Sequence, residues 1–161
     1  MINREGIETE LYLVQHGEAT LKEENPERPL TEKGREDVTK IADFLKKCDL
    51  DIDVIWHSTK KRAIETAEIL ARILLPKKGI EKKEGLAPND SVRKIFVIIE
   101  QERNNAMIVG HLPFLQKLAS LALTGSEDDQ IIGFRQGGVV SLQRTEERWR
   151  LVFAITPDLL T

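Results

Sequence analysis

Two histidines in this sequence each stand at the end of a short apolar run. His16 follows the run at 11–14, and His111 follows the run at 106–109. A neutral imidazole is a good nucleophile near pH 7, because its ordinary pKa is about 6.5. Arg62 adds a guanidinium, whose planar fork can bind two oxygens of a phosphate group. If the fold gathers these side chains in one place, they indicate a site for phosphoryl chemistry.

The elements that must position these residues alternate between apolar strands and amphipathic helices. Continuous apolar, β-prone runs predict buried strands, and apolar residues repeated every three or four positions predict helices. We predict strands at 11–14, 52–56, 106–109, 134–142 and 149–155, and a short edge strand within 79–84. We predict four helices: the first over about 31–48, the second from 58 or 59 to 76, the third after the start cluster at 88–91, and the fourth from Pro113. This order predicts an α/β fold, a three-layer α/β/α sandwich with a mostly parallel central sheet. Ligands of such sheets bind beyond the carboxyl ends of the strands, where His16 and His111 stand.

Length and composition favour one globular domain in the cytoplasm. The 161 residues fit a single domain, expected at 10–161 after a polar N-terminal extension at 1–9. The net charge of −3 gives no reason to expect binding to nucleic acid or to a membrane. No apolar run approaches the roughly 18 residues of a membrane span, and the polar start does not read as a signal peptide. With Cys48 as the one cysteine, we expect neither an internal disulfide nor a cysteine-based metal site.

Four segments resemble, in the correct order, motifs of the histidine phosphatase superfamily, whose best-known member is phosphoglycerate mutase. Residues 13–18 (LVQHGE) resemble its Arg-His-Gly signature, and residues 109–113 (VGHLP) are similar to its Gly/Ser-His-x-Pro turn. Residues 58–66 (STKKRAIET) look like its second motif, a serine followed by an Arg-Ala pair and a threonine. Residues 28–34 (RPLTEKG) match the segment before its first helix. The resemblance runs from about 11 to 155, and the short chain looks most like the SixA-type phosphohistidine phosphatases.

The resemblance implies a role for each motif residue. His16 is implied as the nucleophile that accepts the phosphoryl group, with Gly17 allowing the tight turn behind it. Arg62 and His111 are implied as ligands of the phosphate oxygens, and Glu18 is a candidate general acid. Water then hydrolyses the phosphohistidine intermediate, so the resemblance implies no cofactor and no metal. Positive charge around the phosphoryl group is the main physical requirement of such a reaction.

One position departs from the superfamily pattern. The first motif begins with Arg in the superfamily, whereas this chain has Gln15 there, so the pocket lacks one cation. The amide of Gln15 can still donate a hydrogen bond to phosphate. Arg28, in the loop that follows, is a hypothetical replacement for the missing charge, and the alternative is a solvated loop arginine. Ser58 is predicted as a helix cap, with contact to phosphate as a second role.

The chemistry of the leaving group favours phosphohistidine as the substrate. Superfamily members that release an alkoxide use a carboxylate as general acid, and here Glu18 and Asp90 are the candidates. An imidazole leaves more readily, because its conjugate acid has a pKa near 6.5. A weak acid therefore fits a phosphohistidine on a protein, for example on a phosphotransfer domain in signal transduction. Two alternatives remain: a broad phosphomonoesterase for small metabolites, and a phosphate-binding regulatory module that has lost turnover because of Gln15.

Other polar residues receive ordinary structural interpretations. His57 ends the strand at 52–56 and is predicted to serve packing, since the superfamily pattern does not require it. The adjacent glycines at 137–138 predict a bulge or a close backbone approach near the site. The lysines at 60–61 predict a solvated face that can also steer an acidic partner. The three histidines stand on different predicted strands without short ligand spacing, so no metal site is predicted.

Overall fold

The computed structural model describes residues 6–160, and their elements alternate between strands and helices as predicted. None of the helices in this part of the chain is long and apolar enough to span a lipid bilayer. The elements in chain order are β1 (Ile7–Gln15), α1 (Glu32–Lys47), β2 (Val54–His57), α2 (Lys61–Leu74), β3 (Ile80–Lys82), α3 (Val92–Glu102), β4 (Ala106–Gly110), α4 (Phe114–Thr124), β5 (Val139–Thr145), β6 (Arg148–Ile155) and a closing 3-10 turn (Pro157–Leu159).

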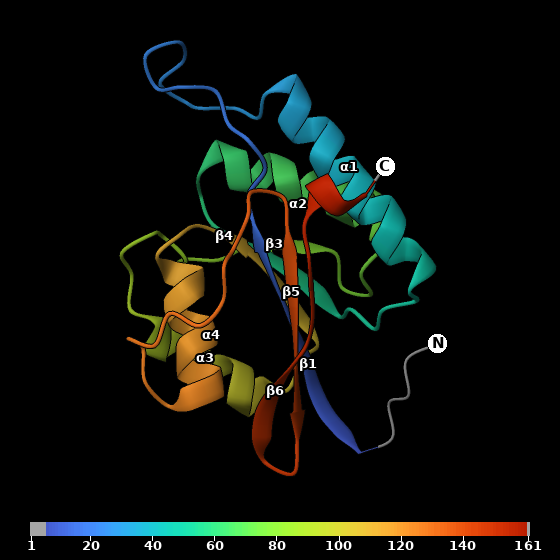
Figure 1. Cartoon of the computed structure of the whole chain (residues 1–161), viewed down its shortest axis with the longest axis vertical. Helices are drawn as coiled ribbons and strands as arrows, with labels where there is room; N and C mark the ends of the chain where they lie inside the picture. Colours follow the sequence, from blue (N-terminus) through green and yellow to red (C-terminus); the bar gives the residue numbers. More distant parts are fainter. Residues whose placement is uncertain (1–5, 161) are drawn as a thin grey trace.

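The six strands form one sheet in the order β3-β2-β4-β1-β5-β6. The first four of these are parallel, and β5 and β6 join antiparallel at one side. Side chains alternate across the sheet: Leu11 and Leu13 pack in the cluster with α3 and α4, whereas Tyr12 and Val14 pack in the cluster with α1 and α2. Figure 1 shows the two helix pairs on opposite sides of the sheet. The predicted three-layer α/β/α sandwich is confirmed.

Side-chain caps begin two of the α-helices in the described chain, α1 and α3. The Thr31 hydroxyl accepts a hydrogen bond from the Gly34 backbone N–H at 3.0 Å and caps α1, and Ser91 caps α3 through the Arg93 N–H. The predicted cap of α2 by Ser58 or Thr59 is wrong. Lys60 occupies the cap position and makes no side-chain cap bond. The Ser58 hydroxyl has another partner, described below.

Two predicted boundaries differ from the structure. Residues 7–9, assigned to the N-terminal extension, form the start of β1, and Thr9 is buried; residues 1–5 lie outside the described part. The strand predicted at 134–142 begins only at Val139. Gly137 precedes it with a left-handed φ of +74°, and its N–H donates to the backbone carbonyls of Gln15 and His16. The glycine pair therefore makes the predicted close approach to the site, but outside a strand.

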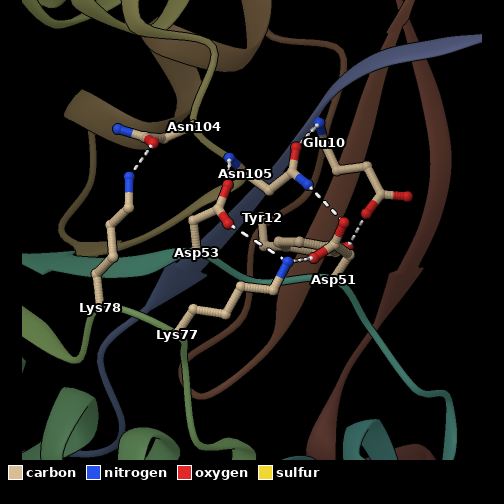
Figure 2. A network of polar contacts seen from close by, with 8 residues as sticks. All are labelled: Glu10, Tyr12, Asp51, Asp53, Lys77, Lys78, Asn104 and Asn105. Atoms are coloured by element: carbon tan, nitrogen blue, oxygen red, sulfur yellow. Dashed lines mark hydrogen bonds and ion pairs between the residues drawn. The ribbon is translucent and has the colours of Figure 1, made fainter.

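A polar network ties together the amino ends of the parallel strands (Figure 2). Asn105, just before β4, accepts a bond from the Glu10 N–H of β1 and donates its amide to Asp51. Its backbone N–H donates to Asp53, which precedes β2, and Lys77 forms ion pairs with both aspartates. These contacts fix the register of β1, β2 and β4 at their amino ends, whereas His16 and His111 follow the carboxyl ends. The carboxyl ends of the same strands therefore have defined relative positions.

Candidate phosphate site

His16 lies at the carboxyl end of β1 with its imidazole held in one orientation. Its backbone N–H donates to the Gly110 carbonyl of β4, and its side chain is only 7% exposed. The ring Nδ1 lies 2.7 Å from the Gly17 carbonyl oxygen, which can only accept, so Nδ1 carries the proton. Burial lowers the pKa of His16 to about 4, the bond to Gly17 opposes this shift, and the positive charges of Arg62 and Arg28 add to it. At neutral pH the imidazole is uncharged, with its lone pair on Nε2.

Gly17 fits because the space around it is closed, not because of an unusual φ. A Cβ at this position would lie 2.9 Å from Val38 and 3.0 Å from the carbonyl oxygen of Gly34, both in α1. Its N–H donates to the hydroxyl of Thr66 at 3.0 Å, and that hydroxyl donates to the Arg62 carbonyl. The turn behind His16 is thus packed against α1 and bonded to α2.

His111 follows β4 and lies beside His16, with the two ring centroids 5.2 Å apart. It is 2% exposed, and its Nε2 is 2.6 Å from the Ser58 hydroxyl oxygen. Its Nδ1 is buried without a hydrogen-bond partner in the described part of the chain. Burial is the main cause that lowers the pKa of His111 to about 3, with contributions from His16, Arg62 and nearby lysine and arginine charges. The ring is therefore neutral and has one polar atom available for a ligand.

Two arginines supply positive charge next to these imidazoles. Arg62 stands in the first turn of α2, and its Nε is buried without a hydrogen-bond partner among residues 6–160. Burial lowers its pKa, and the neighbouring charge of Arg28 lowers it further. Arg28 is held by a bond from its Nε to the Thr20 carbonyl at 3.1 Å, and its charge lowers the pKa of both His16 and His111. Both arginines line an open cavity of about 650 Å³.

The other predicted site residues, Gln15, Glu18 and Asp90, are not part of this cluster of imidazoles and guanidinium groups. Gln15 ends β1 opposite Gly110, and its side-chain oxygen is buried without a partner in the described residues. The Glu18 carboxylate accepts a bond from the Thr31 hydroxyl at 2.9 Å, so it is engaged at the start of α1. The Asp90 carboxylate accepts from the Ala87 N–H in its own loop. The structure thus brings His16, His111, Arg62 and Arg28 together and gives the two carboxylates structural partners.

Two positioning residues were missed by the sequence interpretation. Thr66 was part of the second motif, but nothing in the motif showed that it bonds to Gly17. Glu65 accepts from the Leu30 N–H at 2.8 Å and pairs with Arg35 of α1 at 2.6 Å, which holds the loop before α1 against α2. No local signal distinguishes Glu65 from a solvated helix residue, because both of its partners lie at least 30 residues away.

His57 takes no part in the cluster formed by His16, His111, Arg62 and Arg28. It is 5% exposed at the end of β2, and its Nδ1 lies 2.9 Å from the Ser58 carbonyl oxygen. This burial agrees with the packing role predicted for it. Within residues 6–160, no three His, Cys, Asp or Glu side chains gather closely enough to hold a metal ion.

Comparison with known proteins shows the family of the chain. Residues 11–87 match the model of the histidine phosphatase superfamily, branch 1. An uncharacterized protein of Picosynechococcus sp. strain PCC 7002 is 30% identical over 141 residues, which cover 83% of this chain and 84% of that protein.

Solved structures share the fold across different phosphatases. The protein histidine phosphatase SixA complexed with tungstate superposes with a TM-score of 0.82 at 21% identity, covering 95% of this chain and all of that one. The α-ribazole phosphatase from Shigella flexneri gives a TM-score of 0.76 at 15% identity, covering 92% and 97% of the two chains. At such identities the likeness concerns the fold, which these two phosphatases have in common.

Proposed function

Because the chain belongs to the histidine phosphatase superfamily, a superfamily of phosphatases, we propose that His16 carries the phosphoryl group during turnover and that the substrate is a phosphohistidine on a protein. The observation that carries this proposal is the state of His16. Its Nδ1 proton is held by Gly17, so the lone pair of a neutral imidazole is on Nε2, among Arg62, Arg28 and His111.

The reaction follows from these groups in two steps. In the first, the Nε2 lone pair of His16 forms a bond to phosphorus, while the bond from phosphorus to the substrate nitrogen breaks and its electron pair stays on that nitrogen. The other ring nitrogen of the substrate imidazole carries a proton, so the ring leaves as neutral imidazole. Arg62 and Arg28 balance the charge of the phosphoryl oxygens, and the free Nδ1 of His111 can donate to one of them. In the second, a water oxygen bonds to phosphorus, the bond to His16 breaks and its electron pair returns to Nε2. Both protons of the water leave with the phosphate, which is released as dihydrogen phosphate.

The environment of the carboxylates supports a substrate with a good leaving group. Glu18 and Asp90 are both engaged by groups of the chain itself, Glu18 by Thr31 and Asp90 by Ala87. A phosphomonoester needs a proton donor for its alkoxide, whereas an imidazole leaves as a weaker base with a conjugate-acid pKa near 6.5. Because both candidate carboxylates are engaged in this way, the site suits phosphohistidine better than a phosphate ester.

Two rival functions have specific support. The fold is shared with an α-ribazole phosphatase, which favours a phosphomonoesterase for small molecules as the second candidate. A phosphate-binding module without turnover is the third, because Gln15 removes one cation from the first motif. Incubation with a phosphohistidine peptide, p-nitrophenyl phosphate and a sugar phosphate, each with a chelator present, separates the three. We expect turnover of the peptide alone to be efficient. Equal or better turnover of the esters, loss of activity with chelator, or binding without turnover contradicts the proposal.

Arg28 is proposed to replace the arginine that the first motif lacks. Its charge acts on both imidazoles and its guanidinium lines the same cavity as Arg62, although it comes from a different loop. The variant Arg28→Ala should bind tungstate or phosphate about tenfold more weakly, as expected for one lost charge-assisted contact. Arg72→Ala, at the exposed far end of α2, removes the same charge and should leave the oxyanion affinity unchanged. Unchanged oxyanion affinity in Arg28→Ala, measured by calorimetry, would show that Arg28 is only a loop residue.

A further inference from the structure

The cavity lined by Arg28 and Arg62 is more basic than one phosphoryl group requires. Five cationic side chains and a single carboxylate line it, in a chain whose net charge is −3. Two of the cations, Arg28 and Arg62, are assigned to the phosphoryl oxygens above. The remaining ones are Lys22, Lys60 and Lys61, and the carboxylate is Glu27. Positive charge is therefore concentrated around this opening.

The ammonium groups of Lys22 and Lys60 have no hydrogen-bond or ion-pair partner within the described residues. Lys61 pairs with Glu27 at 3.1 Å, which accounts for the carboxylate of the cavity wall. Lys22 and Lys60 are exposed, and neither ammonium makes a hydrogen bond or an ion pair with residues 6–160. Among the causes that lower the pKa of His111, the charge of Lys60 comes after burial, His16 and Arg62, so Lys60 lies near the site without belonging to it. Two free positive charges thus flank the opening.

The loop that carries Lys22 projects outward from the body of the molecule. Two contacts hold the ends of this loop together. Ala19 and Leu30 form an isolated antiparallel β-bridge, and the Thr20 N–H donates to the Pro29 carbonyl at 2.7 Å. Figure 1 shows this loop extending beyond the helices at the top of the view. Leu21, which stands between Thr20 and Lys22 in this loop, is 59% exposed. A small phosphorylated metabolite inside the cavity gains little from such a projection, whereas a protein surface above the site can contact it.

We propose that Lys22 and Lys60, here called the basic rim, bind aspartate or glutamate side chains that flank the phosphohistidine on a substrate protein. This inference rests on the proposed function and specifies its substrate. The rim presents two exposed ammonium groups from two separate elements, the projecting loop and the start of α2, so it matches carboxylates spaced along a surface. Each such exposed ion pair adds only modestly to binding affinity. Its main effect is to raise the rate at which enzyme and substrate associate productively.

Two phosphohistidine peptides of equal length test the rim. One carries Asp and Glu around the phosphohistidine, and the other carries Asn and Gln at the same positions. We expect kcat/KM to be about 3- to 10-fold higher for the acidic peptide at low salt, and this ratio to shrink as ionic strength rises. The double variant Lys22→Gln/Lys60→Gln should lose the preference and keep its rate on the neutral peptide. Lys40→Gln/Lys94→Gln removes two exposed lysines elsewhere and should behave like wild type.

The outcomes separate this inference from the proposed function. Equal rates on the two peptides, or a preference that survives in the double variant, overturn the rim while leaving the phosphatase intact. Absence of turnover of both peptides contradicts the proposed function. The rim is then judged by fluorescence anisotropy of the unphosphorylated peptides, of which the acidic one must bind more tightly. Pyrophosphate and phosphate are also compared as competitors of the peptide. If pyrophosphate competes far better and loses this advantage in the double variant, the rim binds a second phosphoryl group, which also overturns the inference.

Discussion

At the scale of single residues, the site depends on which nitrogen of each imidazole carries its proton. The Gly17 carbonyl settles this for His16, because a carbonyl oxygen can only accept. For His111 the partner is the Ser58 hydroxyl, which already accepts a bond from the Lys60 N–H at 3.3 Å. Because a phosphate oxygen at the unpartnered Nδ1 needs a donor, we infer that the hydroxyl proton is donated to Nε2 of His111. The proton of His111 is then on Nδ1, the atom that has no partner in the chain described.

Removal of the Ser58 hydroxyl should therefore impair catalysis without loss of the fold. In Ser58→Ala we expect kcat to fall about tenfold with a smaller change in KM, which corresponds to about 1.4 kcal/mol, the contribution of one hydrogen bond. The ¹⁵N chemical shifts of the His111 imidazole, measured by NMR, should change because the ring is no longer held in one tautomer. Thr59→Ala, at the exposed neighbouring position, is the control. Normal kcat and unchanged shifts in Ser58→Ala would show that Ser58 does not orient this ring.

Sequence reasoning identified the residue types of the site better than their partners. His16, Arg62 and His111 were found because each occupies a motif or the end of an apolar run. The partners of Ser58 and Glu18 were not found. Ser58 contacts a residue 53 positions away, and the Glu18 carboxylate contacts one 13 positions away. Such pairs depend on tertiary packing, which no local pattern encodes.

At the scale of elements, the site is built by strands that are fixed at one end and bear functional groups at the other. Asn105 and its partners align the amino ends of β1, β2 and β4, and His16 and His111 follow at the carboxyl ends. The strand and helix order could be predicted from apolar periodicity. The Asn105 network could not, because its members are polar loop residues that are far apart in the sequence. Likewise, the start of β5 was misplaced, since the chain turns at Gly137 and the strand predicted from 134 begins only at Val139.

Contact between α1 and the turn after β1 leads to a prediction at this scale. A Cβ on Gly34 would collide with the backbone of Glu18, which cannot move as a flexible side chain does. Gly34→Ala should therefore displace the segment after His16. We expect it to lower the free energy of unfolding by about 1–3 kcal/mol and to reduce phosphatase activity. Urea unfolding and kinetics measure both effects. Glu36→Ala, on the exposed side of the same helix, should change neither. Full stability and activity in Gly34→Ala would mean that the contact is easily relieved.

At the scale of the whole molecule, two buried neutral imidazoles make stability depend on pH. The pKa values of His16 and His111 lie near 4 and 3 in the folded chain, whereas both return to about 6.5 on unfolding. Between these values the unfolded state binds more protons. The free energy of unfolding therefore falls as the pH drops below about 6.5, and the loss continues until the folded pKa is reached.

A comparison of two variants isolates this effect from that of the carboxylates. Between pH 7.5 and 4.5, wild type should lose about 2 kcal/mol more of its free energy of unfolding than His111→Gln, which has one fewer buried imidazole. Urea unfolding at the two pH values gives the numbers, and NMR titration of the two rings gives their pKa values directly. An equal loss in both proteins, or a pKa near 6.5 for His111, would contradict the account.

The central claim is that His16 carries the phosphoryl group, and a trapped intermediate tests it most directly. The enzyme is mixed with a phosphohistidine peptide in the presence of chelator, quenched in alkali to preserve phosphoramidates, and analysed by mass spectrometry. We predict a mass increase of one phosphoryl group that maps to His16 and is absent from a folded His16→Gln variant. Turnover without any adduct, or an adduct on a different residue, would contradict the assignment.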